Sequence, residues 1–338
     1  MSDPIRLALI GTGIFAQDAH LPAIKALGGA FEIVALCSRR RESAEQLAAQ
    51  LDAPVDVTTD LDALLARDDI DAVDVVVPIH TLPSVVEAAL AAGKHVISEK
   101  PVAPDVATGR RLLARYAPCA GQVWMVAENW RYDHVLLGAA EIIRRGDIGR
   151  PLLLDWALRI DFSPRNKYFS TLWRRENRFP GGLLLDGGVH YAAGLRMLLG
   201  EVAGVSAVAK QNSPDLPPVD TLSAALHFEN GAVGSFGVTY AASAPWPPAL
   251  TITGDGGALR ITNGVITVAA GGDVYTLELP EHQGVRDEFA AFAAAIRDGA
   301  PHRNTPDQAV QDVALVEAML RAAETGQRIT PERIVGLS

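Results

Sequence analysis

A glycine-rich turn near the start of the chain constrains the fold more than any other feature of the sequence. The apolar run Ile5–Ile10 leads into Gly11-Thr12-Gly13-Ile14-Phe15-Ala16, which has the form G-x-G-x-x-A. The first glycine permits a tight turn, the second lets the backbone approach a pyrophosphate, and the alanine lets a following helix pack on the strand. An ordinary glycine turn is the alternative. The position of this turn between a strand and a helix favours a dinucleotide site.

The first part of the chain alternates short β-branched runs with amphipathic helical patterns. Strands are expected at residues 5–10, 33–37, 72–77, 95–98 and 123–127. Helices are expected at residues 43–51, 61–66, 83–92 and 107–116. Asp60 and Asp105 precede two of these helices and can cap them. This alternation predicts a parallel sheet covered on both faces, so residues 1–127 are expected to form an α/β Rossmann domain that binds a dinucleotide.

The pattern changes after residue 127. Residues 151–162 form one long strand-like segment, and residues 203–278 hold several further strand candidates. Asn230-Gly231 and Asn263-Gly264 lie between such runs, and Asn-Gly suits two-residue hairpin turns. Helices are expected near residues 285–296 and 307–324. Residues 128–338 are therefore expected to form an α+β substrate and oligomerisation domain with an open, mostly antiparallel sheet, whose C-terminal helix could pack back on the Rossmann domain.

Composition excludes several classes of function. The chain has 338 residues, enough for two packed domains, and 49% of them are hydrophobic. A net charge of −10 disfavours non-specific nucleic-acid binding. Neither of the two cysteines, Cys37 and Cys119, belongs to a Cys-x-x-Cys pair or a zinc-spaced cluster. No signal peptide or membrane span is evident, so we expect a cytoplasmic protein without a metal that acts on a small molecule.

The residues after the second expected strand bear on the choice of cofactor. An acidic side chain there would accept hydrogen bonds from the ribose of NAD, but the sequence is Cys37-Ser38-Arg39-Arg40-Arg41. Ser38 and Arg39 can bind a 2′-phosphate, with Arg40 as a possible substitute for Arg39. A solvated arginine run is the alternative. Three arginines near the start of a helix gain no stabilisation from the helix dipole, so a bound phosphate explains them better than solvation does. The sequence therefore favours NADP(H) over NAD(H).

Two further motifs carry groups suited to acid–base chemistry. Lys100, in Glu99-Lys100-Pro101, follows the fourth expected strand, at the sheet edge where ligands bind, and a surface lysine is the alternative. Asp186 and His190 lie four residues apart and share a face if the segment is helical. A capping aspartate and a core histidine are the alternative there. The intervening Gly187 and Gly188 suggest that something approaches that backbone closely.

Aromatic and basic residues near these motifs could line a cleft between the domains or simply pack there. They include residues 128–132, which begin the second domain, and residues 166–168 and 173–174, which precede the second motif. The roles of Arg131, Asn166, Lys167 and Tyr168 stay open at this point. The full set of expected cofactor contacts is Gly11, Thr12, Gly13, Ile14, Phe15, Ser38, Arg39, Pro78, His80, Glu99, Lys100, Asn129, Trp173 and Arg174.

The three motifs in this order resemble the Gfo/Idh/MocA oxidoreductase family over nearly the whole chain. The stretches GTGIFAQDAHLP, VAENWRY and NKY…TLWR…GGLLLDGGVH are most similar to an NADP(H)-dependent fungal-type branch. The resemblance implies a Rossmann domain, an open-faced α+β domain, and oxidation of sugar or polyol hydroxyls or reduction of the matching carbonyls. It also implies that Lys100 and His190 are catalytic, together with Asp186, and that the first two converge on the nicotinamide.

Two positions depart from the pattern of many sugar dehydrogenases in the family. Those enzymes carry an aspartate three residues after the histidine, where this chain has Ala193, and a histidine at the position of Leu82, with His80 two residues earlier. Both departures concern the substrate class more than the chemistry. Some relatives use the fold as a ligand-sensing regulator without catalysis, and a hydrolase that uses the bound cofactor is a third, less supported reading. The presence of Lys100, Asp186 and His190 favours an enzyme.

Overall fold

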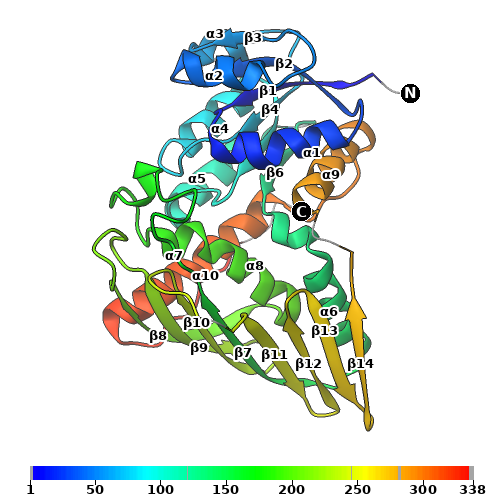
Figure 1. Ribbon diagram of the computed structural model, residues 1–338, viewed down its shortest axis with the longest axis vertical. Helices are drawn as coiled ribbons and strands as arrows, with labels where there is room; N and C mark the ends of the chain where they lie inside the picture. Colours follow the sequence, from blue (N-terminus) through cyan, green and yellow to red (C-terminus); the bar gives the residue numbers. More distant parts are fainter. Residues whose placement is uncertain (1–2, 120, 245, 281–282, 335–338) are drawn as a thin grey trace. The chain divides into compact units, whose positions relative to one another are not determined.

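The computed structural model describes residues 3–119, 121–244, 246–280 and 283–334, and these form two compact units (Figure 1). The first unit contains the described residues up to 129, residues 283–310 and residue 334; the second contains residues 130–280 and 311–333. Sequence analysis assigned residues 283–310 to the second domain. The structure groups them with the first unit because helix α9 (Gly284–Asp298) packs on α1 (Leu21–Ala26) and on β6 (Trp124–Ala127).

The first unit is built on the predicted parallel sheet. Its described strands are β1 (Ile5–Ile10), β2 (Phe31–Cys37), β3 (Asp56–Thr58), β4 (Ala72–Val75), β5 (His95–Glu99) and β6, in the order β3-β2-β1-β4-β5-β6. Every pair of neighbours in this sheet is parallel. Sequence analysis missed β3, because three residues at a sheet edge are too few for a period-two pattern to show. The central strands β1 and β4 are almost entirely buried, as expected of a parallel sheet that is covered on both faces.

Helices cover both faces of this parallel sheet. They are α1, which continues from the π-helix η1 (Ala16–His20), α2 (Arg41–Ala48), α3 (Leu61–Leu65), α4 (Leu82–Ala91), α5 (Val106–Tyr116) and α9. Helices α1 and α9 pack together on one face, and α4 and α5 pack together on the other (Figure 1). The expected N-caps are confirmed. Asp60 Oδ1 accepts from Ala63 N at 3.0 Å and Asp105 Oδ1 from Thr108 N at 2.7 Å.

The second unit contains a large, mostly antiparallel sheet, as expected. Its described strands are β7 (Pro151–Arg159), β8 (Val202–Lys210), β9 (Thr221–Phe228), β10 (Val233–Thr239), β11 (Ala249–Gly254), β12 (Gly257–Thr262), β13 (Val265–Ala270) and β14 (Asp273–Glu278). Their order is β14-β13-β12-β11-β7-β10-β9-β8. The described neighbours are antiparallel except β7 and β10, which run parallel.

One of the two predicted hairpin turns is confirmed and the other is wrong. Asn263 and Gly264, with φ of 51° and 75°, join β12 to β13 as a two-residue turn. At Asn230-Gly231 the connection is longer, because β9 ends at Phe228 and β10 begins at Val233. There Gly231 alone of the pair has a positive φ.

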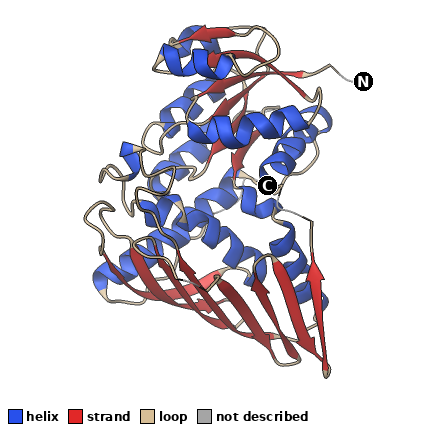
Figure 2. Cartoon of the chain, in the orientation of Figure 1, coloured by secondary structure: helices blue, strands red, loops and turns tan. Residues whose placement is uncertain are grey.

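Helices cover one face of the antiparallel sheet (Figure 2). The described helical segments of this unit are α6 (His134–Arg145), α7 (Leu183–Asp186), α8 (Gly188–Leu199), the larger part of α10 (Pro306–Thr325), the 3₁₀ turn η3 (Leu172–Arg174) and most of η2 (Asn129–Tyr132). Along β10, Gly234, Phe236 and Val238 are buried, while Val233 and Ser235 are exposed. Across the described ranges, no helix combines the length and the apolar character that a membrane crossing needs. The cytoplasmic location expected from the sequence stays a prediction.

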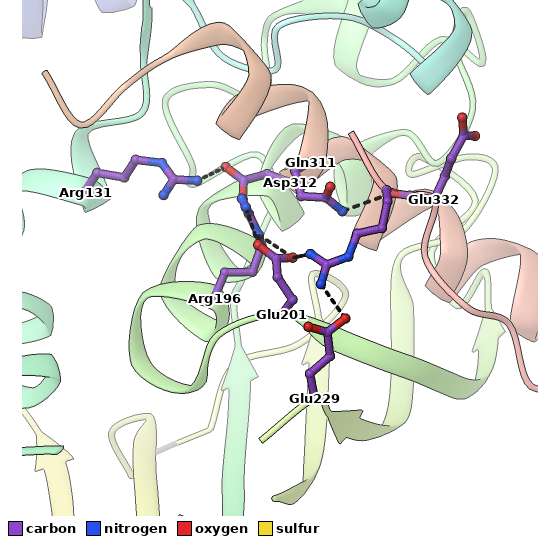
Figure 3. Close-up of polar contacts among 8 residues, drawn as sticks. Arg131, Arg196, Glu201, Glu229, Gln311, Asp312 and Glu332 are labelled. Carbon is purple, nitrogen blue, oxygen red and sulfur yellow. Dashed lines mark hydrogen bonds and ion pairs between the residues drawn. The ribbon is translucent and has the colours of Figure 1, made fainter. Parts of the chain in front are cut away.

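A buried network of charges ties α10 to α8 in the second unit (Figure 3). Asp312 accepts from Arg131 Nη2 and from Arg196 Nη1, both at 2.5 Å. Arg196 also donates to Glu201 at 2.6 Å, and Arg333 pairs with Glu201 at 3.4 Å. The side chains of Asp312 and Arg196 are only 1% and 4% exposed. Arg131, whose role the sequence left open, therefore belongs to this network.

Candidate active site

The predicted dinucleotide turn has the geometry that its glycines require. Gly11 has a φ of 102°, and a Cβ atom there would lie 2.0 Å from the carbonyl oxygen of Val76. No side chain fits at this position, since the chain directly after β4 passes against the turn. At Gly13 a Cβ would meet no atom of the described chain within 4 Å. The backbone at Gly13 is thus open on the side from which a pyrophosphate would approach, so the turn fits a dinucleotide.

The neighbouring residues hold this turn in place. The buried Thr12 hydroxyl hydrogen-bonds to Ser43 Oγ at 2.9 Å, and Gln17 Nε2 donates to Thr12 O at 2.9 Å. Ile14 is half-buried, and the ring of Phe15 meets His20 edge-on with centroids 5.2 Å apart. Thr12 therefore joins the turn to α2 through its side chain. Contacts of residues 12, 14 and 15 with a cofactor stay predictions.

The arginine run divides into engaged and available side chains. Arg41 Nη1 donates to Val57 O at 3.0 Å, and its Nε lies 3.5 Å from Glu45. The side chains of Arg39 and Arg40 are exposed and make no hydrogen bond or ion pair with any residue the structure describes. The half-buried Ser38 follows β2 directly. Ser38, the first predicted phosphate contact, thus lies beside two arginine side chains that the described fold does not use.

The carboxyl ends of β4 and β5 carry the next predicted residues. Pro78 and His80 are half-buried in the loop after β4, and Pro78 O accepts from Thr81 N at 2.8 Å. Leu82 begins α4 and is 1% exposed. The position that holds histidine in many sugar dehydrogenases of the family thus belongs to the core here.

Lys100 is half-buried directly after β5, with its main-chain N 3.2 Å from Glu99 Oε2. The other oxygen of Glu99 lies 2.9 Å from Nε2 of the buried His20. Glu99 was predicted from the sequence to contact the cofactor, whereas His20 was not predicted as a site residue. No local pattern links residues 20 and 99, although His20 stands in the quoted stretch GTGIFAQDAHLP. The carboxylate of Glu99 is occupied by the protein, and a cofactor contact from it stays a prediction.

Asn129 contributes a further polar atom to the first unit. Its Oδ1 is buried and has no hydrogen-bond partner among the described residues. A buried acceptor without a donor costs free energy unless a ligand or water supplies one. The orphaned oxygen fits the predicted role of Asn129 as a cofactor contact.

In the second unit the structure brings Asp186 together with Arg174. Arg174 Nε donates to Asp186 Oδ2 at 2.7 Å, and both side chains are largely buried. The Arg174 guanidinium lies 4.1 Å from the ring centroid of Trp173 and 5.2 Å from that of Tyr168. Asn166 Oδ1 accepts from Tyr168 N at 3.0 Å, and Lys167 Nζ lies 5.1 Å from the Tyr168 ring. Residues 166–174 therefore form one cluster with Asp186, which sequence analysis treated separately.

His190 lies on α8, one turn after Asp186. It is half-buried, and its ring stacks on Trp130 with centroids 5.4 Å apart and planes inclined by 17°. The capping residue of α8 is Gly187, without a side-chain cap, so Asp186 does not cap this helix. His190 is not sealed in the core either. The alternative interpretation, a capping aspartate and a core histidine, is therefore wrong for both residues.

The expected close approach to the backbone at Gly187 is confirmed, and the group that approaches is a tyrosine side chain of the same unit. A Cβ on Gly187 would lie 2.0 Å from the hydroxyl oxygen of Tyr240. Burial, followed by the neighbouring Tyr191, raises the pKa of Tyr240 well above its usual range, so this hydroxyl stays neutral. Ala193, on the same helix, is fully buried. An aspartate at that position would place a carboxylate in the core, which is costly.

Comparison with known proteins identifies the family. Residues 5–127 match the Gfo/Idh/MocA oxidoreductase family with its NAD-binding Rossmann fold, and residues 140–330 match the C-terminal alpha/beta domain of that family. The chain belongs to the Gfo/Idh/MocA oxidoreductase family, as its motifs suggested. Within the described ranges, no group of three or more His, Cys, Asp or Glu residues is arranged to hold a metal ion.

Individual relatives cover almost the whole chain. Dehydrogenase FPY6 of the fungus Fusarium mangiferae is 36% identical over 94% of this chain and 96% of its own length. The crystal structure of an oxidoreductase from Thermotoga maritima is 35% identical, with a TM-score of 0.91 over 97% of this chain and 98% of that one. KijD10, a 3-ketoreductase from Actinomadura kijaniata solved with NADP and TDP-benzene, is 25% identical, with a TM-score of 0.82 over 95% and 98% of the two chains.

Proposed function

We propose that this chain is an NADP(H)-dependent oxidoreductase that transfers a hydride between the nicotinamide and a hydroxyl or carbonyl carbon of a sugar, polyol or related carbonyl compound. The observation that carries the proposal is the placement of His190. Its imidazole neither caps a helix nor fills the core, and it stacks on Trp130 with a half-buried ring. Such a histidine can exchange a proton with a substrate hydroxyl.

Three side chains share the chemistry in this proposal. When bound, the nicotinamide supplies or accepts the hydride. His190 takes the hydroxyl proton during oxidation and returns it during reduction. The ammonium of Lys100 donates to the same substrate oxygen and favours its anionic form. Asp186 keeps Arg174, and with it residues 166–174, in position through the 2.7 Å contact.

The relatives support both the reaction type and the substrate class. The matches include a dehydrogenase and a 3-ketoreductase solved with NADP, and a ketoreductase performs the carbonyl reduction proposed here. The test is NADPH and NADH consumption with a panel of sugars and keto compounds, and the reverse reaction with polyols. We expect turnover with at least one member of the panel. Tight cofactor binding without turnover on any of them would instead favour a non-catalytic ligand sensor.

Arg39→Ala is expected to weaken NADPH binding by about 1.5–3 kcal/mol, the scale of a hydrogen bond to a charged group. NADH binding should stay nearly unchanged, because NADH carries no 2′-phosphate. Fluorescence titration of both cofactors measures the effect. Arg41→Ala is the matched control: Arg41 is already engaged by Val57 O and Glu45, so NADPH affinity should change by less than about 0.5 kcal/mol. Equal or tighter binding of NADH by the unmodified protein would refute the NADP(H) preference.

We also propose that a second copy of the chain covers the exposed face of the antiparallel sheet. Leu153 and Val233 face each other on the paired strands β7 and β10, and are 41% and 44% exposed. Light scattering at micromolar concentration should give at least twice the mass of one chain. Replacing both residues with aspartate should shift the mass toward a single chain, since charges cannot be buried there without partners. A single-chain mass for the unmodified protein would contradict the proposal.

A further inference from the structure

A buried histidine that the proposed reaction does not use lies beneath the Lys100 motif in the first unit. His20, on η1, is fully buried, and both of its ring nitrogens contact carboxylates. Nδ1 lies 2.8 Å from Asp74 Oδ2 on β4, and Nε2 lies 2.9 Å from Glu99 Oε1 on β5. The rings of Phe15 and Phe289 meet the imidazole edge-on, each with a centroid distance of 5.2 Å. Three separate elements thus converge on one imidazole.

The geometry fixes the number of protons in this trio. Two hydrogen bonds between an imidazole and two carboxylates need two protons, whichever atoms carry them, so the trio has a net charge of −1. Burial lowers the pKa of His20, but Asp74 and Glu99 outweigh burial and hold it well above its ordinary value. A neutral histidine without a shared proton would leave one carboxylate buried and unpaired, which is costly.

Two further acids face the trio from neighbouring elements. Glu288 on α9 is fully buried and accepts from Asn304 Nδ2 at 3.1 Å. Burial, followed by the charge of Glu99, raises the pKa of Glu288 well above its usual range. Glu128, after β6, is also buried and adds to that rise. The protein therefore concentrates acids around His20, and His20 is the cationic partner that two of them contact.

Glu99 connects this buried trio to the active-site lysine. One carboxylate oxygen binds His20, and the other accepts from the main-chain N of Lys100 at 3.2 Å. Because both oxygens are held, the side chain of Glu99 cannot turn without breaking one of these contacts. The path from the imidazole to the lysine backbone consists of two consecutive hydrogen bonds.

We propose that His20 is a positioning residue: through Glu99 it fixes the main chain that carries Lys100. This inference rests on the role of Lys100 in the proposed function. His20 is fully buried and cannot touch a substrate, so its effect on turnover has to pass through Glu99. A misplacement of about 1 Å in a catalytic group is enough to lower turnover by about 100-fold.

Two isosteric replacements separate positioning from mere stability. The amide nitrogen of glutamine can occupy the place of histidine Nε2, and that of asparagine the place of Nδ1. His20→Gln therefore keeps the donor to Glu99 and loses that to Asp74, while His20→Asn does the opposite. We expect kcat to fall less than about fivefold in His20→Gln and about 30- to 100-fold in His20→Asn, with KM changed less than kcat. Similar kcat values in two variants of similar Tm would overturn the inference.

The Lys100→Met background shows whether the effect passes through Lys100. Residues that act as one unit are non-additive, so His20→Asn should lower kcat no further once Lys100 is gone. A full additional loss in the double variant would overturn the inference. If Lys100→Met is impaired and His20→Asn is not, the inference fails and the proposed function stands. Full turnover in Lys100→Met removes Lys100 from the proposed function, and the inference falls with it.

A second pair of variants covers the case in which His20→Asn does not fold. Glu99→Gln keeps the reach of the side chain and can donate to His20 and accept from Lys100, although it loses the charge. Glu99→Asp keeps the charge, but its shorter side chain cannot span both contacts. We expect kcat to fall less than about tenfold for Glu99→Gln and about 30- to 100-fold for Glu99→Asp, each with NADPH-dependent stabilisation in a thermal melt as the sign of a folded protein. The reverse order would show that charge matters and position does not.

Discussion

Replacement of His190 with alanine is expected to lower kcat by about two or more orders of magnitude, because general acid–base catalysis contributes about 100- to 10,000-fold. NADPH should still bind, because the dinucleotide turn at residues 11–16 belongs to the other unit. Steady-state kinetics with the best substrate of the panel and NADPH titration measure the two effects separately.

The exposed His227 on β9 provides a matched control for this substitution. His227→Ala removes the same side chain from the same unit without touching α8, so turnover should stay within about twofold. Because His227 pairs with Val233 on the face proposed for the second copy, the mass of this variant by light scattering is measured alongside its turnover. Full turnover in His190→Ala would remove His190 from the mechanism. A loss of NADPH binding together with turnover would instead indicate a damaged fold.

Asp312→Ala is expected to destabilise the protein by about 3–5 kcal/mol, since it leaves buried charges without their partner. Asp312 is 1% exposed and accepts from both Arg131 and Arg196 at 2.5 Å. Arg196 keeps its contacts with Glu201, whereas Arg131 loses its ion pair with Asp312. Chemical denaturation followed by circular dichroism gives the difference in the free energy of unfolding.

Glu324→Ala, on the exposed side of the same helix, is the control and should change stability by less than about 0.5 kcal/mol. Equal stabilities of the two variants would mean that the buried network of Figure 3 contributes nothing to the fold. Because Arg131 follows Trp130, the ring that stacks on His190, the Asp312→Ala variant also shows whether this network holds His190 in place.

Most of the first unit could be predicted from the sequence because its signals are local. The apolar runs, the glycine turn and the capping carboxylates of Asp60 and Asp105 each lie within a few residues of the structure they produce. Strand β3 could not be predicted, since three residues show no period. Helix α9 could be predicted as a helix, but its packing with α1 could not, because nothing in its own pattern says which core receives Phe289 and Phe292.

The candidate site also contains residues that could be predicted from local motifs and residues that could not. Lys100, Asp186 and His190 stand in short motifs and were visible, whereas their supporting partners are distant in sequence. The chain places His20 79 residues before Glu99, and Arg174 12 residues before Asp186, so no spacing rule connects them. The close approach at Gly187 was inferred from composition, but only the fold shows that Tyr240 makes it.

The parallel pairing of β7 with β10 has a consequence for how the second unit folds. Strands β8, β9 and β10 form one local meander, and β11 to β14 form another, so each can assemble from neighbouring hairpins. Strand β7 lies between them and pairs with both, and residues 160–232 separate it from β10. Closing that long crossover is entropically slow compared with closing a hairpin. We therefore expect β7 to dock late in folding, and residues 160–201 of the crossover, which hold Arg174, Asp186 and His190, to become ordered in the same step.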